Sequence, residues 1–569
     1  MIEGSMHVRR SEARGREGAV SAGHPDAVGA ALTLLETGGN AFDAIVGAAF
    51  ASFVVEPAQC GLGGYARLAG FDARARRLVS VDGYLRAPAA AREDMFEIDD
   101  TRGLKYYETP WTKDLKGEKG HLAAGVPGAV AALWEVHQRR GRLDWARVLE
   151  PSIRLAERGL TVTWNQLLHI CEVHRLMRRY PSMYRHFCPG GELPRINGQF
   201  GGATVLDLSE LAHTLRLIAD KGPSGFYEGR VAELIEQEIR EGGGILTAED
   251  LASYRPKVLE ETPLDFHGLD CITCFCPTSA EFLNLLGTFD LSSATGAASH
   301  HLMAECMLTA FTDTIHWYGD PDFEDAPVAA LSSAEFARLR ARAIDPTRAM
   351  PRPPQPASAD ELRVSSGESL PQALETTPWA PKLGGTTQVA VTDGEGNMAA
   401  VCISLSDAHG SLVYCPGTGV VLNNGMQNFD PRPGRPNSIK PGKMPIFAAP
   451  VLVATRHGEP VFAAAGSGGY RILTGVMHTF VNWAVHAMDL RRAIEAPRIH
   501  CQSRETFVDE RFPDAIVEEL AVMGHDVRLQ RDMPGLNAFA RVSAVTREPA
   551  GGLLTSAAWP PWINVADAI

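Results

Sequence analysis

Residues 381 to 397, PKLGGTTQVAVTDGEGN, place two glycines directly before two threonines that begin a predicted strand. A threonine hydroxyl is a poor nucleophile unless a base removes its proton. A free α-amino group has a pKa near 7.7–8.0, which suits this task at neutral pH. A chain that cuts itself between Gly385 and Thr386 would supply nucleophile and base in one residue. The structural alternative is a loop that runs into an edge strand, because threonine is a good strand former.

The neighbouring glycines fit the same chemistry. Gly384 and Gly385 can adopt strained or left-handed geometry, which would expose the scissile carbonyl to the threonine hydroxyl. An acyl-transfer enzyme also needs donors for the oxyanion. In AAGSGGYRI, residues 464 to 472, a predicted strand ends in Gly468 and Gly469, and two successive N–H groups can converge where a helix begins. Each piece alone is common in ordinary structural segments.

These residues need elements to position them. Residues 24–56 contain two predicted helices separated by GGN, with Asn40 as the cap of the second. A Gly-rich turn and a hairpin follow at 61–83, and residues 121–250 are mostly helical. Strand patterns return after residue 386. We therefore expect one α/β core built from two chain segments.

Two segments are expected to lie outside that core. Residues 1–17 are polar and lack the apolar region of a secretory signal, so we expect a disordered extension and a cytoplasmic protein. Residues 346–385 carry many prolines and few large apolar groups, which predicts an exposed, extended linker before the cleavage point.

Composition excludes several classes of function. The net charge of -14 over 569 residues argues against a nucleic-acid partner. No window approaches 18 uninterrupted apolar residues, so no membrane span is expected. The run Cys271, Cys274 and Cys276 lacks a second Cys/His pair at zinc-finger spacing, which favours buried free thiols. We expect neither a metal nor a cofactor.

Ordered motifs from about residue 20 to 510 resemble the γ-glutamyltranspeptidase family, whose members are N-terminal-nucleophile hydrolases. They include HP...GGNAFDA, VVEP...GLGG, GVPGAVAALWEVHQRRG, GGGILTAEDLASYRP, YGDPDF, TTQVAVTDGEGN, PGTGVVLNN, PGKMP, GSGGYRI and EAPRIH. The resemblance implies a four-layer αββα sandwich with a large helical insertion in the N-terminal subunit. It also implies a large subunit of residues 18–345 and a small subunit of residues 386–569 that carries the nucleophile.

Roles for individual residues follow from the same resemblance. Thr386 matches the catalytic threonine, Thr387 the usual second threonine, and Ser404 the hydroxyl residue that hydrogen-bonds the nucleophile. Gly468 and Gly469 match the oxyanion pair. The resemblance implies an acyl-enzyme on Thr386 and transfer of the acyl group to water or an amine. Its partners would be a small-molecule amide, the protein's own two subunits, and a second copy in a homodimer of heterodimers.

The residues expected to read a γ-glutamyl group depart from the family pattern. Tyr84 stands where the family has an arginine for the α-carboxylate, and Arg86 lies two residues on, where strand alternation would place it on the same face. Asn428, after Gln427, replaces the acidic partner of the α-ammonium. Ser406 stands at the position of an asparagine, and Phe447 lies where a serine pair is expected.

We therefore expect an amide hydrolase acting on a small carboxylate-bearing amide without a required α-ammonium. This pattern resembles oxamate-amidohydrolase-like members of the family. The alternative is a true γ-glutamyltransferase or glutathione hydrolase with a divergent pocket. A catalytically silent scaffold and a triad hydrolase using His409 fit the residues less well. Arg86 alternatively forms a structural ion pair, and Tyr84 and Phe447 either line a pocket or only pack.

Overall fold

The computed structural model describes residues 11–105, 108–196, 201–352, 354–366, 384–447, 449–532, 538–549, 552–560 and 563–569. Two seven-stranded antiparallel sheets form its centre. The first sheet has the order β1 (Glu12–Gly15), β20 (Leu554–Ala558), β19 (Arg541–Arg547), β15 (Glu459–Ser467), β14 (Val451–Arg456), β9 (Leu269–Ile272), β8 (Leu264–Phe266). The second has the order β21 (Val565–Ala568), β2 (Gly18–Ala22), β10 (Gly384–Asp393), β11 (Met398–Asp407), β3 (Tyr65–Asp72), β4 (Arg77–Gly83), β7 (Lys257–Leu259).

The central strands β10 and β11 are buried along almost their whole length. β11 is largely apolar, as expected for a strand covered on both faces, whereas β10 also carries buried polar residues such as Thr387 and Gln388. Successive side chains still point to opposite faces. Val389 and Val391 of β10 pack in the core beneath the N-terminal helices. Ala390, between them, packs in the core shared with the first sheet. The two sheets therefore lie face to face, and even-numbered residues at the start of β10 point into the layer between them.

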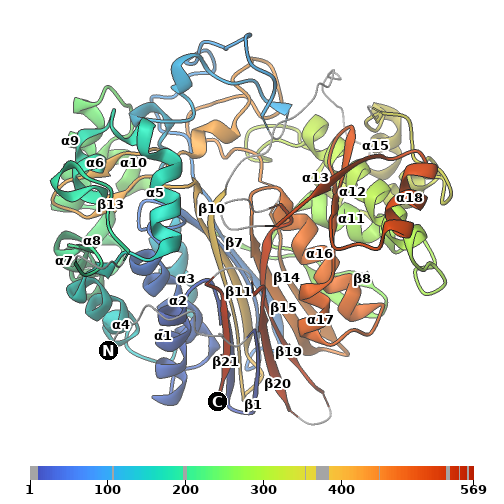
Figure 1. The fold of residues 1–569 in the computed structure, drawn as a ribbon, viewed down its shortest axis with the longest axis horizontal. Coiled ribbons are helices and arrows are strands. Elements are labelled where there is room, and N and C mark those ends of the chain that lie inside the picture. Colours follow the sequence, from blue (N-terminus) through green and yellow to red (C-terminus); the bar gives the residue numbers. More distant parts are fainter. Residues whose placement is uncertain are drawn as a thin grey trace.

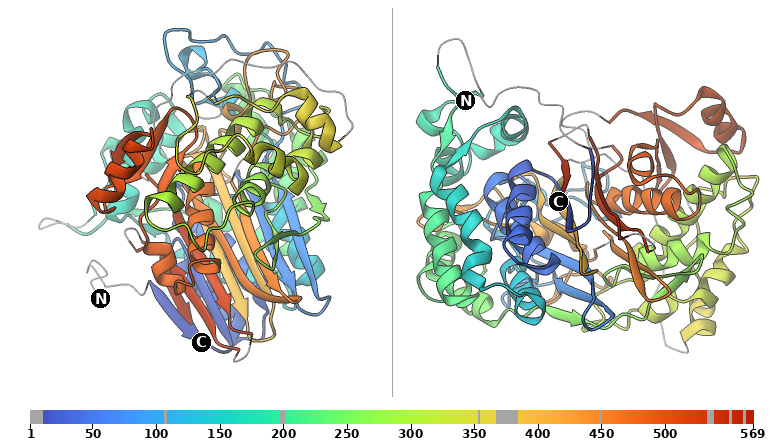
Figure 2. Two further views of the ribbon diagram at one scale, coloured as in Figure 1. Left: turned by 90° about the vertical axis from the view of Figure 1, so that its right-hand side faces the viewer. Right: turned by 90° about the horizontal axis from the view of Figure 1, so that it is seen from below.

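Helices cover both outer faces of this sandwich (Figure 1). On the side of the second sheet lie α1 (Pro25–Glu36), α2 (Ala41–Val55), α3 (Ala129–Arg140), α4 (Trp145–Arg158), α5 (Trp164–Met177), α6 (Pro181–Phe187), α7 (Ser209–Lys221), α8 (Ser224–Tyr227), α9 (Gly229–Glu241) and α10 (Ala248–Ser253). On the other side lie α11 (Pro277–Leu286), α12 (Ala297–Trp317), α13 (Val328–Leu331), α14 (Ala334–Ala341), α15 (Ala359–Ser366), α16 (Arg471–Ala484), α17 (Leu490–Glu495) and α18 (Asp514–Val522). The view from below shows the four layers in section (Figure 2).

Three small sheets lie outside the sandwich, formed by β5 (Leu160–Thr161), β6 (Val205–Leu206), β12 (Tyr414–Cys415), β13 (Val420–Val421), β16 (Ile499–Cys501), β17 (Glu505–Asp509) and β18 (Asp526–Gln530). The expected αββα sandwich and the helical insertion, α3 to α10, are thus confirmed. The GGN break also behaves as expected, because Asn40 and Asp43 form a capping box at the start of α2.

Two expectations about the chain outside the core need correction. Glu12–Gly15 are not disordered, since they pair with β20 at the edge of the first sheet; residues 1–10 lie outside the described residues. The predicted extended linker contains the helix α15, and Leu362 is buried beside Trp317 and Phe336. Its overall composition concealed this local apolar contact. Residues 353 and 367–383 lie outside the described residues.

None of the helices in the described part of the chain has the length and apolarity needed to cross a bilayer.

Candidate active site

Sheet register brings three hydroxyl side chains into one row. Thr386 on β10 pairs with Ser404 on β11, and Ser404 pairs with Tyr65 on β3. Paired residues of neighbouring strands present their side chains on the same face. This row therefore lies at the end of the layer between the two sheets. A β-bulge separates the Gly385–Ser406 pair from the Thr386–Ser404 pair, and such bulges often re-aim side chains beside active sites.

A hydrogen-bond chain connects the expected nucleophile to the bond that it would attack. Thr386 Oγ1 lies 2.9 Å from Ser404 Oγ, and Ser404 Oγ donates to the carbonyl oxygen of Gly385 at 2.7 Å. Because the single proton of Ser404 is used on Gly385, the Thr386 hydroxyl is the donor to Ser404. The Ser406 N–H also donates to Ser404 Oγ at 2.9 Å. Thr386 itself is only 4% exposed.

Gly384 and Gly385 do not adopt the left-handed geometry that the sequence suggests. Both lie in β10, and neither has a positive φ. A Cβ on Gly385 would lie 1.9 Å from the carbonyl oxygen of Asp407. Close backbone approach at the bulge, not a left-handed conformation, therefore excludes a side chain at Gly385.

Gly468 and Gly469 lie beside the same segment. A Cβ on Gly384 would be 3.1 Å from the backbone nitrogen of Gly469 and 3.5 Å from the Cα of Gly468. The φ values are 140° at Gly468 and 63° at Gly469, so both occupy conformations that favour glycine. They follow β15 directly and precede α16. The structure thus brings the expected oxyanion pair to the residue just before the Gly385–Thr386 segment.

Thr387 points to the opposite face of β10 and meets Glu56, which follows the last residue of α2. Its hydroxyl donates to both carboxylate oxygens of Glu56 at 3.0 Å. Burial raises the pKa of Glu56 to about 7, opposed by the charge of Arg541 and by the hydrogen bond from Thr387. Thr387 therefore contacts an acid that titrates near neutral pH, and its side chain does not join the row of Thr386.

Arg541, at the start of β19, reaches Thr386 from the other sheet. Its Nη2 donates to the carbonyl oxygen of Thr386 at 3.0 Å, and its Nε donates to Ser467 Oγ at 2.8 Å. The side chain is buried, and burial lowers the pKa of Arg541 to about 10 although Glu56 partly opposes the effect. One cation therefore contacts both the backbone of Thr386 and Ser467, the residue before Gly468.

The expected substrate-binding residues form an uncharged cluster beside this row. Asn428 Nδ2 donates to Tyr84 Oη at 2.8 Å, and Ser406 Oγ lies 2.9 Å from Tyr65 Oη. Ser406 has a φ of 78°, a conformation that a residue with a side chain rarely adopts. The Phe447 ring lies 4.7 Å from that of Tyr84, between ring centroids. Burial raises the pKa of Tyr65, so its hydroxyl stays protonated.

Arg86 is separate from this cluster. Its Nη1 lies 3.1 Å from Asp320 Oδ2, and the Asp320 side chain is fully buried. Because β4 ends at Gly83, the strand-alternation argument that placed Arg86 on the face of Tyr84 does not apply. The backbone carbonyl of Gln427 accepts from Lys105 Nζ at 3.2 Å. The structure therefore gives Arg86 an ion pair and brings only Tyr84, Ser406, Asn428 and Phe447 together.

Sequence reasoning missed three residues here: Tyr65, which belongs to the row, Arg541, which contacts Thr386, and Glu56, which contacts Thr387. Glu56 is the first charged residue after the wholly buried helix α2, and Arg541 interrupts the small, apolar segment NAFARVSAV. A charged residue within an apolar segment predicts a buried charge with a partner, because charges are rarely buried unless they are paired. This pattern could have identified both residues. Tyr65 directly follows GLGG, and only its strand register identifies it.

His409, considered as a triad residue, does not serve the row. It is buried, its ring lies 4.6 Å from Phe187 between centroids, and neither ring nitrogen has a hydrogen-bond partner among the described residues. Burial lowers the pKa of His409 well below its usual value. A buried neutral imidazole facing the helical insertion is not placed to activate Thr386.

One metal-type group occurs among the described residues: His301, Glu305 and His525, whose ligand atoms lie within 4.8 Å of one another. His301 Nδ1 and His525 Nε2 are already hydrogen-bonded to each other at 2.8 Å. Arg352 holds the Glu305 carboxylate at 2.6 Å. A cation at this point would meet a fixed guanidinium, so we assign the group a structural role.

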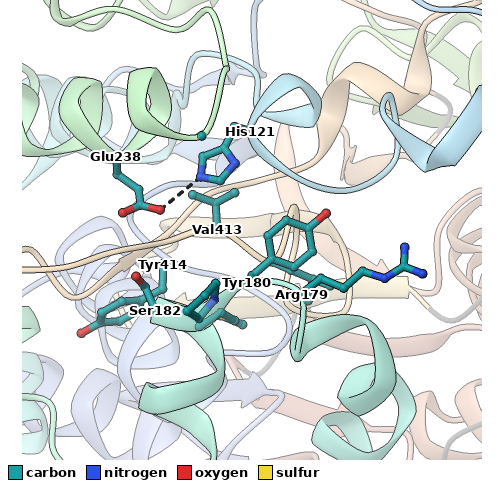
Figure 3. A pocket seen from close by; sticks show the side chains of 11 residues that line it. His121, Arg179, Tyr180, Ser182, Glu238, Val413 and Tyr414 are labelled. Carbon is teal, nitrogen blue, oxygen red and sulfur yellow. Dashed lines mark hydrogen bonds and ion pairs between the residues drawn. The ribbon is translucent and has the colours of Figure 1, made fainter.

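A cavity of about 270 Å³ lies elsewhere, between α6, α9 and residues 412–414 (Figure 3). Its walls include Arg179, Tyr180 and an ion pair between His121 and Glu238, 3.1 Å apart. None of the expected site residues lines it, so it is distinct from the Thr386 row.

Comparison with known proteins agrees with this geometry. The model of the family described as gamma-glutamyltranspeptidase matches residues 27–563. The chain is 32% identical to Acylase ACY 1 proenzyme of Pseudomonas sp. (strain SE83), over 97% of this chain and 93% of that protein. It is 28% identical to Glutathione hydrolase proenzyme of Bacillus subtilis (strain 168), over 90% of this chain and 85% of that protein.

A solved structure with the same architecture is that of cephalosporin acylase from Bacillus halodurans, with a TM-score of 0.85. The two share 26% identity, and the match covers 100% of this chain and 99% of the other. The continuous family match over both chain segments, together with the N-terminal-nucleophile fold, settles the classification. The chain belongs to the γ-glutamyltranspeptidase family of amide hydrolases and transferases.

Proposed function

We propose that the chain cuts itself between Gly385 and Thr386, and that Thr386 is then the nucleophile of an amide hydrolase. The observation that carries this proposal is the chain Thr386–Ser404–Gly385, with both hydroxyl contacts under 3 Å. It supplies a nucleophile, a route for its proton and a polarised carbonyl within three residues. Relatives that are named proenzymes support the self-processing step.

In the first reaction, Thr386 Oγ1 attacks the carbonyl carbon of Gly385. The proton of Thr386 passes to Ser404 Oγ while the proton of Ser404 passes to the carbonyl oxygen, so no ionised base is required. The peptide C–N bond then breaks and its nitrogen takes a proton. Water hydrolyses the ester between Gly385 and Thr386, leaving a free carboxylate on Gly385 and a free α-amine on Thr386.

In turnover, the free α-amine removes the proton of the Thr386 hydroxyl as it attacks the substrate amide. The N–H groups of Gly468 and Gly469 receive the oxyanion. The amine of the substrate leaves with the proton, and the acyl group remains on Thr386 as an ester. Water, or an acceptor amine, then attacks this ester and releases the acyl group.

The preferred substrate is a small carboxylate-bearing amide that lacks an α-ammonium. The side chains of Tyr84, Asn428 and Ser406 are joined by neutral hydrogen bonds, so these three side chains offer no carboxylate to an ammonium group. The neighbouring carboxylate of Asp82, which accepts from the Tyr84 N–H, is already paired with Arg67 at 3.4 Å. Arg86 would contact the substrate carboxylate through the guanidinium nitrogens that do not face Asp320. Similarity to an acylase and to a cephalosporin acylase supports an amide other than glutathione.

The second candidate is a γ-glutamyltransferase or glutathione hydrolase with a divergent pocket. Similarity to proteins named glutathione hydrolase favours it. Turnover of a γ-glutamyl anilide, compared with a glutaryl anilide that differs only by the α-ammonium, separates the two. Preference for the glutaryl compound supports the first candidate, and preference for the γ-glutamyl compound supports the second.

Intact mass of the purified protein tests the nucleophile. Wild type should give a fragment of residues 386–569, Thr386→Ala should remain uncut and inactive, and Thr386→Ser should cut slowly. Thr392→Ala is the matched control, because Thr392 is a buried threonine of the same strand that bonds the Asn397 carbonyl. Full-length wild-type enzyme with amidase activity would refute self-cleavage at this bond.

A further inference from the structure

We infer that Arg541 is a positioning residue that fixes the nucleophile relative to the oxyanion glycines and keeps the Thr386 α-amine unprotonated. The inference rests on the proposed function, since it assigns a role around the same nucleophile. No sequence motif indicates Arg541, which lies on the sheet opposite Thr386. Its contacts, burial and charge each bear on the assignment.

The two contacts of Arg541 join the two halves of the site. Nη2 holds the carbonyl oxygen of Thr386 at 3.0 Å, and Nε holds Ser467 Oγ at 2.8 Å. Ser467 is the last residue of β15 and directly precedes Gly468 and Gly469. The N–H donors of a planar guanidinium have fixed relative positions. These two contacts therefore fix the distance between Thr386 and the segment of Gly468 and Gly469, which we call the oxyanion loop.

The guanidinium is itself anchored on its other side. With its amide oxygen facing Arg541, Gln59 accepts from Nη1 at 3.2 Å, and its amide nitrogen donates to Glu56 Oε1 at 2.8 Å. Glu56 also accepts from the hydroxyl of Thr387. Arg541 and Glu56 are 2% and 3% exposed, so these contacts are made away from solvent. Buried charges with several fixed partners hold their geometry well.

The charge of Arg541 also acts on the catalytic base. The amine nitrogen and the carbonyl oxygen of one residue are three bonds apart, so the guanidinium lies about 5–7 Å from the Thr386 nitrogen. A cation at that distance disfavours the ammonium form and lowers the pKa of the amine. The amine is then the free base at a lower pH than it would otherwise be, which favours proton removal from the hydroxyl.

Other ionisable groups face this point from the surrounding elements. Those that the structure describes are Glu56, Cys60, Tyr65, Lys119, His169, Asp407 and Asp532. Lys119 is paired with Asp407 at 3.3 Å, and Tyr65 stays protonated. Glu56 opposes Arg541 and reduces its effect on the amine. The expected net effect of Arg541 on the amine is therefore about one pH unit.

The experiment compares Arg541→Met, Arg541→Lys and Ser467→Ala with wild type, using mature enzyme and a chromogenic amide. Arg541→Met should lower kcat by about 100-fold, because small displacements of a nucleophile are costly. It should also move the acidic limb of kcat/KM upward by about one pH unit. Arg541→Lys keeps the charge and should hold the limb near its wild-type position. Ser467→Ala removes only the oxyanion-side contact and should lower kcat by about 10-fold without changing KM.

Arg547→Met is the matched control, because Arg547 lies on the same strand and donates to backbone carbonyls at the far end of β10. It should leave kcat and the pH profile unchanged. Wild-type kcat and an unshifted limb in Arg541→Met would overturn the inference, as would equal losses in Arg547→Met. An Arg541→Met protein that keeps its melting temperature but fails to cut itself supports the inference, since self-cleavage uses the same hydroxyl. If Thr386→Ala is cut and active, the proposed function fails instead.

Discussion

At the scale of residues, the site combines neutral hydroxyl groups with two buried charges. Thr386, Ser404 and Tyr65 share one row, and in the proposed self-cleavage the hydroxyl groups of Thr386 and Ser404 pass protons without a formal charge. Glu56 and Arg541 lie behind and across from that row and form contacts with Thr387 and Thr386. In the proposed mechanism, self-cleavage and turnover use the same nucleophile with different bases, first a hydroxyl relay and then the α-amine.

Arg86 gives a test at this scale. If it binds the substrate carboxylate, Arg86→Ala should raise KM about 10-fold or more for an acidic amide and leave the KM of its neutral isostere unchanged. Self-cleavage should remain intact. Steady-state kinetics with the paired substrates measure this difference.

The ion pair with Asp320 requires a control, because its loss leaves a buried carboxylate without its cation. Arg86→Ala combined with Asp320→Asn removes both charges and should recover the melting temperature while KM for the acidic amide stays high. A wild-type KM for the acidic amide in this double variant would show that Arg86 has only a structural role. Equal KM changes for both substrates in Arg86→Ala would show the same.

At the scale of elements, three ends meet: the start of β10, the end of α2 and the end of β15. The sequence predicts the first and third, because Gly-Gly-Thr-Thr and Gly468-Gly469 are local patterns. It does not predict Tyr65 or Arg541 at the site, since their places depend on sheet register and on packing of residues about 155–320 positions from Thr386. The sequence also does not show why residue 385 must be a glycine, because the cause is the close approach of its backbone to the carbonyl of Asp407.

The oxyanion loop gives a prediction at this scale. Gly469 has a φ of 63°, and a Cβ there would meet nothing within 4 Å. Gly469→Val is therefore strained by its backbone alone, and the N–H groups must turn to relieve that strain. We expect kcat to fall by about 10²–10³ with the fold retained.

Gly268→Val is the matched control, with a φ of 74° and equally open space in the turn between β8 and β9. It carries similar strain away from the site and should keep wild-type kcat. Circular dichroism and kcat of the two variants measure fold and turnover together. Full activity in Gly469→Val would remove this glycine from the oxyanion site.

At the scale of the whole molecule, two chain segments on either side of residues 367–383 build one sandwich. Periodicity predicts one α/β core built from two chain segments, and the four layers are predicted only through the family resemblance that the ordered motifs carry. Predictions from the average composition of a long segment are wrong where a few of its residues form local contacts. Leu362 of α15 is buried in one cluster with Ala357, Trp317 and Phe336, and β1 forms because a short polar segment supplies backbone partners to β20.

The outer helical layer gives a prediction about stability and pH. Glu281 of α11 is fully buried, and burial together with the negative charge of Asp313 raises the pKa of Glu281 well above its usual value. The folded chain thus retains a proton that the unfolded chain releases above about pH 4.5. Stability is therefore lost as pH rises from that value toward the folded pKa. Glu281→Gln cannot ionise, so it should be more stable than wild type at pH 8, by about 2 °C in Tm, and equal near pH 4.

Glu518→Gln, on the exposed face of α18, is the control and should shift Tm equally little at both pH values. Differential scanning fluorimetry at pH 4 to 8 follows the difference between each variant and wild type. A Glu281→Gln difference that is constant across this range would show that Glu281 does not hold a proton in the folded state.

The central claim is that Thr386 is an N-terminal nucleophile, and mass spectrometry of the quenched enzyme tests it most directly. Active protein is mixed with a slow amide substrate, denatured in acid and resolved into its fragments. We expect a fragment of residues 386–569 that gains the mass of the acyl group, with the adduct mapped by peptide sequencing to Thr386. An active enzyme whose adduct lies on another residue, or whose Thr386 remains joined to Gly385, would contradict it.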